Sequence, residues 1–157
     1  MSEHETFMRR AIALSRKHME AGHGGPFGAV VVQDGKIVGE GWNQVTSQND
    51  PTAHAEVVAI RNACKTLGRF SLAGATIYTS CEPCPMCLAA AYWARVDALY
   101  YGNTQADAAA IEFDDAFLYD EMARPIRQRS LKCEQILRDE ALEVFKAWAA
   151  KPDKVRY

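Results

Sequence analysis

Apolar residues recur along the chain with two different periods, and the alternation between them predicts an α/β fold. Helical spacing starts near the N-terminus, ends at the glycines before Pro26, and returns at 57–67, 85–94 and 141–148. Short apolar runs rich in β-branched or aromatic residues lie between the helical segments and predict strands at 29–32, 37–38, 76–79 and 98–101.

The order of these segments predicts how the strands pair. Asp34-Gly35 is a strong signal for a two-residue hairpin turn, so the strands on either side of it should be antiparallel. The later strands alternate with helices, and such crossover connections join parallel strands. We therefore expect a single domain, residues 1–157, with a mixed sheet that helices cover on both faces.

Length and charge exclude several classes of protein. The 157 residues suffice for one domain and are too few for two comfortable ones. The formal net charge is −2, with 48% hydrophobic and 24% charged residues, which argues against disorder and against a basic surface that wraps nucleic acid. No apolar run reaches the roughly 18 residues of a membrane span. The acidic start does not resemble an export signal, so we expect a cytoplasmic protein.

Three of the five cysteines, Cys81, Cys84 and Cys87, crowd together, which predicts a metal or redox site rather than a disulfide framework. Cys84 and Cys87 begin a predicted helix three positions apart, so they can present two thiolates to one ion. Pro85 suits the first helical position, and a helix N-terminus favours thiolate over thiol. Cys81 should lie on the strand end, where a buried apolar role is favoured over that of a ligand.

His54 offers a third ligand at another strand-to-helix transition. On a regular helix, positions two apart differ by roughly 200° around the axis, so His54 and Glu56 can face one ion only at the helix entry. One histidine and two cysteines leave the fourth position of a zinc ion open, as in catalytic sites. Such an ion makes water acidic, and Glu56 would pass the proton of that water to a leaving group.

Other roles remain open for these residues. Cys84 and Cys87 could form a redox pair or half of a structural metal site, and the whole cluster could stabilise a binding module without catalysis. The ion could be iron, although two thiolates and an imidazole favour zinc.

His54-Ala55-Glu56 and Pro83-Cys84-Pro85-Met86-Cys87 resemble the signature of the zinc-dependent cytidine and nucleobase deaminase superfamily. Within it, the chain is similar to small bacterial guanine deaminases over nearly its whole length, including Gly24 to Ala29, Asn49 to Glu56, Tyr78 to Cys87, Tyr92 to Arg95, Phe113 to Asp115, and Tyr157. The resemblance implies a cytidine deaminase-like fold, a three-layer α-β-α sandwich with a mixed, about five-stranded central sheet. It also implies one zinc ion (Zn2+) per subunit.

The activity implied by this resemblance is hydrolytic deamination of guanine to xanthine and ammonia. Zinc-bound hydroxide would attack C2 of the base, and Glu56 would move the proton. Asp115, favoured over Asp114, would accept hydrogen bonds from guanine N–H groups and assist in moving protons. Either aspartate could instead cap a helix.

The resemblance also assigns residues to the substrate pocket. Phe27 and Trp93 would flank the base, Asn43 would read the purine edge, and the backbone N–H of Ala55 would add a donor. From the sequence alone, Trp93 could equally belong to a core and Asn43 could merely end a strand.

Small guanine deaminases are similar to one another in exchanging C-terminal segments within a dimer. In this chain the segment is 142–157, so Tyr157 would close the pocket of the partner subunit. A helix that packs on its own chain is the alternative. We expect a homodimer that takes a purine base as its small-molecule partner, without a membrane or nucleic-acid partner.

A tRNA adenosine deaminase is the main rival, because it shares the segments around His54 and Cys84. Such an enzyme would need a basic surface, and acidic residues dilute the basic run between Arg124 and Arg138. Cytosine, cytidine or an aminotriazine remain alternative substrates.

Overall fold

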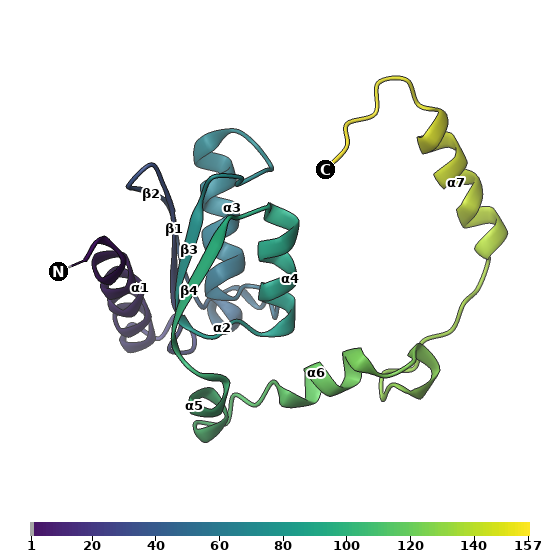
Figure 1. Ribbon diagram of the computed structural model, residues 1–157. Helices are drawn as coiled ribbons and strands as arrows, with labels where there is room; N and C mark the ends of the chain where they lie inside the picture. The colour runs from purple at the N-terminus through teal and green to yellow at the C-terminus, as the bar shows by residue number, and fades with distance from the viewer. Residues whose placement is uncertain (1) are drawn as a thin grey trace. The chain divides into compact units, whose positions relative to one another are not determined.

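The structure of the protein is a computed structural model that describes residues 2–157, and its centre is a four-stranded sheet in the order β2-β1-β3-β4. β1 pairs antiparallel with both β2 and β3, whereas β3 and β4 are parallel, so the sheet is mixed as predicted (Figure 1). The strands are β1 (Gly28–Gln33), β2 (Lys36–Trp42), β3 (Thr76–Cys81) and β4 (Ala98–Asn103).

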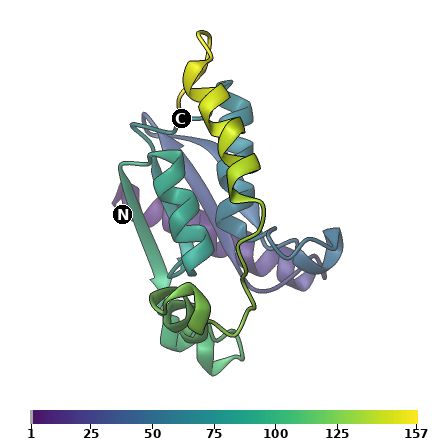
Figure 2. The ribbon, with the colours of Figure 1, turned by 90° about the vertical axis from the view of Figure 1, so that its right-hand side faces the viewer.

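Helices cover both faces of the sheet, which confirms the predicted three-layer α/β architecture. α1 lies on one face, and α3 and α4 lie together on the other (Figures 1 and 2). The helices are α1 (Glu3–Glu20), α2 (Val45–Gln48), α3 (Ala55–Leu67), α4 (Pro85–Ala94), α5 (Gln105–Ala110), α6 (Ala116–Ala123) and α7 (Arg138–Ala150), with a 3₁₀ turn at Ile126–Gln128.

The sheet has one strand fewer among the described residues than the about five that the family resemblance implied. After β4 the chain enters α5, whose sequence is rich in alanine, a strong helix former. Thr104 and Asp107 form a capping box that fixes the start of this helix. The chain therefore continues from β4 into a helix.

Alternating side chains of β1 and β3 divide the core between the two faces. Val30 and Tyr78 point toward α1, where they pack with Phe7 and Leu14. Val31 and Ile77 point the other way and pack against the alanines of α3 and α4. β1 is therefore buried on both faces, which explains its continuous apolar run.

Small residues let α3 lie directly against β2. A Cβ atom on Gly41 would stand 2.2 Å from the carbonyl oxygen of Ala55, and one on Gly39 would stand 2.5 Å from that of Ala59. Any larger residue at either position would push the helix away. These glycines thus set the position of the first turn of α3, which carries Glu56.

The chain divides into two units, one from the N-terminus to Ala116 and one from Phe117 to Tyr157. The first contains the sheet, and the second contains most of α6, the 3₁₀ turn and α7. A single domain over residues 1–157 stays a prediction. Among residues 2–157, no helix is both long and apolar enough to cross a membrane.

His18 is a buried histidine on α1 with two ring partners. Its ring stacks on Trp42 at a centroid distance of 3.6 Å, and its Nδ1 lies 2.8 Å from Nδ1 of His23. A hydrogen bond between these nitrogens needs one of them unprotonated. Burial is the main cause that lowers the pKa of His18. The positive groups of His23, Lys17 and Arg10 lower this pKa further, and the carboxylate of Glu40 raises it in part.

We predict that the free energy of unfolding decreases as the pH falls below about 6.5, the ordinary pKa of histidine. The pKa of His18 is lower in the folded protein, so the unfolded chain binds more protons in this range and becomes favoured as the pH falls. Urea unfolding above and below this pH should show the loss, and His18→Gln should reduce the pH dependence. An unchanged pH dependence in the variant would contradict this assignment.

Candidate active site

The structure brings together the three predicted metal ligands, His54, Cys84 and Cys87. Their ligand atoms all lie within 4.8 Å of one another. Nδ1 of His54 is 3.6 Å from Sγ of Cys84 and 3.5 Å from Sγ of Cys87. With the usual zinc bond lengths, tetrahedral geometry places sulfur and nitrogen ligands about 3.6 Å apart. The spacing therefore fits a zinc ion.

Two helix starts position these ligands. His54 and Cys84 are the N-cap residues of α3 and α4, with extended backbones at ψ 154° and ψ 169°. Neither side chain makes a capping hydrogen bond, so both can point to an ion. This geometry confirms the prediction that His54 precedes the regular helix. Cys87 lies on the first turn of α4.

The thiols of Cys84 and Cys87 interact strongly with each other. Hydrogen bonds from Cys87 and His54 lower the pKa of Cys84, whereas the bond to Cys84 and burial raise the pKa of Cys87. Cys84 is therefore the more acidic of the two thiols, and the thiolate is the form that binds a metal ion.

Cys81 lies outside this cluster. Its sulfur faces the carbonyl oxygen of Thr104 at 3.9 Å, and burial together with the nearby charge of Glu56 raises its pKa to about 11. Its sulfur is not among the ligand atoms that converge in the cluster. This position agrees with the apolar role expected for Cys81.

Glu56 is buried in the first turn of α3, with only 6% of its surface exposed. It hydrogen-bonds to the Cys87 thiol, and its Oε1 lies 2.9 Å from Oγ1 of Thr79. Burial raises the pKa of Glu56, while these hydrogen bonds lower it in part. A carboxyl group poised in this way can both accept and release a proton. Sequence reasoning did not assign a role to Thr79, because a threonine in a strand gives no sign of function by itself.

The Asn43 side chain has one fixed orientation. It is 7% exposed, and its Oδ1 accepts hydrogen bonds from the N–H groups of Gly25 at 3.3 Å and Val45 at 3.1 Å. Only the NH2 end of the amide is left to donate to a ligand.

Two further predicted pocket groups lie at element ends in the first unit. Ala55 is the first residue of α3, where a backbone N–H has no acceptor within its own helix. Phe27 meets Phe113 edge to face, with ring centroids 5.0 Å apart at 89°. In the sequence, Phe113 was indicated only as part of the Phe113-Asp114-Asp115 segment and had no predicted role of its own.

The two neighbouring aspartates differ in their surroundings. Oδ1 of Asp114 accepts a hydrogen bond from the N–H of Ala116 at 2.9 Å, which is a capping role at the start of α6. Oδ1 of Asp115 is buried and has no hydrogen-bond partner among the described residues. Burial raises the pKa of Asp115, and a hydrogen bond with Gln105 lowers it. Asp115 thus has one carboxylate oxygen that no described residue satisfies.

Trp93 and Tyr157 are not brought to the metal cluster by the fold of the first unit. Trp93 is 64% exposed on α4, and six residues after Cys87 a helix has turned about 240° and risen about 9 Å. Tyr157 belongs to the second unit and is 76% exposed. Their predicted roles stay predictions.

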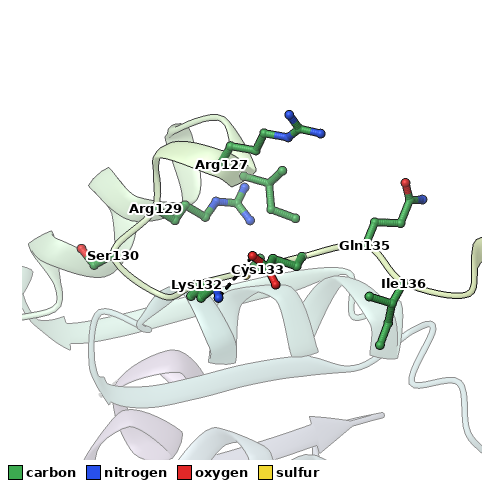
Figure 3. Close-up of a pocket in the computed structure, with 9 residues that line it drawn as sticks. Arg127, Arg129, Ser130, Lys132, Cys133, Gln135 and Ile136 are labelled. Atoms are coloured by element: carbon green, nitrogen blue, oxygen red, sulfur yellow. Dashed lines mark ion pairs between the residues drawn. The ribbon is translucent and has the colours of Figure 1, made fainter.

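A cavity of about 940 Å³ lies within the second unit, lined by residues between Ile126 and Ile136 (Figure 3). Two of its basic side chains, Arg129 and Lys132, have partners of their own. Arg129 donates to the carbonyl oxygens of Glu121 and Arg124, and Lys132 pairs with Glu134 at 3.2 Å. None of the predicted site residues lines this cavity.

Comparison with known proteins identifies the family. Residues 1–103, which include all three ligands, match the cytidine and deoxycytidylate deaminase zinc-binding region. The chain belongs to this deaminase family. The matched zinc-binding region contains the cluster of His54, Cys84 and Cys87 that the structure assembles.

Individual relatives extend the similarity beyond this region. Guanine deaminase of Bacillus subtilis is 52% identical over 154 residues, 98% of this chain and 99% of the relative. An X-ray structure of guanine deaminase from Bacillus subtilis aligns with a TM-score of 0.96 over 100% of this chain and 99% of that chain, at 52% identity. The tRNA-specific adenosine deaminase of Agrobacterium fabrum is 42% identical over 112 residues, 71% of this chain and 73% of the relative.

We predict that the purified deaminase holds about one zinc ion per chain and that Cys84→Ala holds almost none, because two ligands do not retain the ion. Elemental analysis after dialysis measures the zinc content. Cys64→Ala is the matched control, since this half-buried thiol lies outside the cluster and should keep its zinc. Full zinc content in Cys84→Ala would show that the ligand set is wrong.

Proposed function

We propose that this protein is a guanine deaminase that converts guanine and water to xanthine and ammonia. The similarity to guanine deaminase of Bacillus subtilis over 98% of the chain carries the proposal. The similarity to the tRNA-specific adenosine deaminase covers 71% of the chain. The longer match favours guanine as the substrate over a tRNA adenosine.

The residues of the cluster account for hydrolysis. His54, Cys84 and Cys87 would hold the metal. When bound, zinc is a Lewis acid that makes water reactive as hydroxide near neutral pH. Glu56, beside Cys87, takes the proton from the attacking water and delivers it to the departing amino group.

The polar groups proposed for the pocket suit a 6-oxopurine. The NH2 group of Asn43 and the N–H of Ala55 are donors for a carbonyl oxygen or a ring nitrogen. The unpartnered Oδ1 of Asp115 is an acceptor for the N–H groups of guanine. Adenine carries an amino group where guanine has an oxygen. The donors of Asn43 and Ala55 would then face another donor instead of an acceptor. Phe27 supplies an apolar face for the base.

We predict that the protein releases ammonia from guanine and that Glu56→Gln lowers kcat by about 10²- to 10⁴-fold, because the proton shuttle is lost. Zinc content and folding should stay unchanged, since Glu56 is not a ligand. Ammonia release is measured for guanine, adenine, adenosine, cytosine and cytidine, with a tRNA substrate alongside. Glu20→Gln, at the exposed end of α1, is the matched control and should keep full activity.

Two results would overturn these assignments. Deamination of tRNA or another base without any on guanine would refute the proposed substrate. Unchanged activity in Glu56→Gln would refute the role of this residue.

The protein is further proposed to act as a homodimer that exchanges residues 142–157. α7 has no buried residue, and its apolar side chains Val144, Phe145 and Trp148 are 67%, 74% and 45% exposed. An amphipathic helix of this length is marginal in water unless its apolar face is covered. A second subunit would cover that face, and Tyr157 would reach the partner's pocket near the exposed Trp93.

We predict that two inactive chains restore activity to each other when they are coexpressed. One carries Glu56→Gln and an intact C-terminus, and the other keeps Glu56 but lacks Tyr157. In an exchanged dimer, the intact Glu56 meets the intact Tyr157 of the other chain, so hybrid dimers recover part of the wild-type rate. Purification through two different tags isolates the hybrids. Activity no higher than that of either parent chain would contradict the exchange.

The protein is also proposed to be cytoplasmic. The cluster needs two reduced cysteines, and reducing compartments preserve thiols.

A further inference from the structure

Thr79 is a buried residue on β3 to which the proposed function gives no role. Only 1% of it is exposed, and it lies on the same face of the strand as Ile77 and Cys81. Valine has nearly the same shape and would fill this position without a polar atom. Because a buried hydroxyl costs free energy unless it is hydrogen-bonded, the threonine is explained by what its hydroxyl contacts.

The hydroxyl lies between two oxygen atoms of different character. Its Oγ1 is 2.9 Å from Oε1 of Glu56 and 3.2 Å from the carbonyl oxygen of Cys81. Both oxygens can accept the single hydroxyl proton, and the contact with Oε1 is the shorter one. A carboxyl group continues to accept at Oε1 as long as any proton it carries is on its other oxygen.

We propose that Thr79 is a positioning residue for the proton transfer by Glu56, an inference that rests on the proposed function. Thr79 donates to Oε1 of Glu56 and holds the carboxyl group in place. The other carboxylate oxygen takes the proton of the attacking water and passes it to the departing nitrogen, so Thr79 keeps its own proton and its hydrogen bond throughout.

A hydroxyl donor suits a carboxyl group that exchanges a proton, because Oε1 accepts its hydrogen bond before and after the other oxygen takes the proton. The position of the hydroxyl is also fixed, because threonine is stiff about χ1 and β3 is paired on both sides, to Ala29 and Tyr101 at this residue. Glu56 therefore keeps one hydrogen bond and one place through both proton transfers.

Substitutions that remove or keep the hydroxyl test this role. Thr79→Val should lower kcat roughly ten- to hundredfold, the effect of losing a hydrogen bond to a charged group, with KM changed by less than about twofold. Thr79→Ser should restore most of the rate. Thr76→Val makes the same chemical change at the other end of β3 and should leave kcat unchanged. A Thr79→Val rate equal to that of Thr76→Val would overturn the proposal.

A second pair of variants covers the case in which Thr79→Val loses zinc or fails to fold. Thr79→Ser and Thr79→Ala both lack the γ-methyl group and differ only in the hydroxyl. A higher kcat in Thr79→Ser, at equal zinc content, supports the proposal, and equal rates overturn it. Each rate is taken relative to wild type on the base that wild type deaminates fastest. A preferred base other than guanine would therefore overturn the proposed substrate without changing this comparison.

A stability measurement tests the contact without any turnover. In chelator-treated protein, Tm is measured for Thr79→Val, Glu56→Ala and the double variant. If the two side chains hydrogen-bond, the double variant loses less Tm than the sum of the two single losses. Fully additive losses would show that the contact is absent and overturn the proposal.

Discussion

The convergence of two helix N-termini at one point beside the sheet is the arrangement on which the site depends. His54 and Cys84 are the N-cap residues of α3 and α4, and their ligand atoms lie 3.6 Å apart. Both helices reach this point because their buried faces consist mainly of alanines, and because Gly39 and Gly41 let α3 approach β2. The small residues of the core thus determine the geometry of the metal ligands, which are far apart in the sequence.

The same arrangement explains the electrostatic character of the site. Two helix N-termini favour negative charge, which suits thiolate ligands and an attacking anion. A zinc ion held by two thiolates and a neutral imidazole would carry no net charge, so it would not act on Glu56 as a cation. The burial of Glu56 then favours the protonated acid, while its hydrogen bonds favour the carboxylate. A carboxyl group balanced between these effects can take up a proton and give it away again.

Local sequence patterns predicted the parts of the site that depend on spacing within one segment. The Cys84 and Cys87 pair and the position of His54 at a helix entry follow from helical geometry alone. The hydrogen bond of Thr79 with Glu56 joins residues 23 positions apart, and the Asn43 amide is fixed in part by Gly25, 18 positions away. The periodic spacing of residues within one helix or strand does not indicate contacts between such distant positions. Asp114 and Asp115 likewise differ in whether a carboxylate oxygen is buried without a partner. Two identical residues next to each other in the sequence give no indication of this difference. The fifth strand was expected from resemblance, and the alanine-rich segment after Asn103 forms a helix instead.

The proposed exchange of C-terminal segments would make the pocket a property of the dimer. An exposed aromatic face on α7 costs free energy in every monomer, and this cost is removed when a partner covers the face. Trp93 lies on the exposed side of α4 in the first unit, so the fold of one chain leaves an aromatic surface for such a segment to contact. If the last wall of the pocket comes from the partner subunit, dissociation removes a substrate contact while the zinc ligands and Glu56 stay intact. Dilution would then weaken substrate binding before it affected the metal centre.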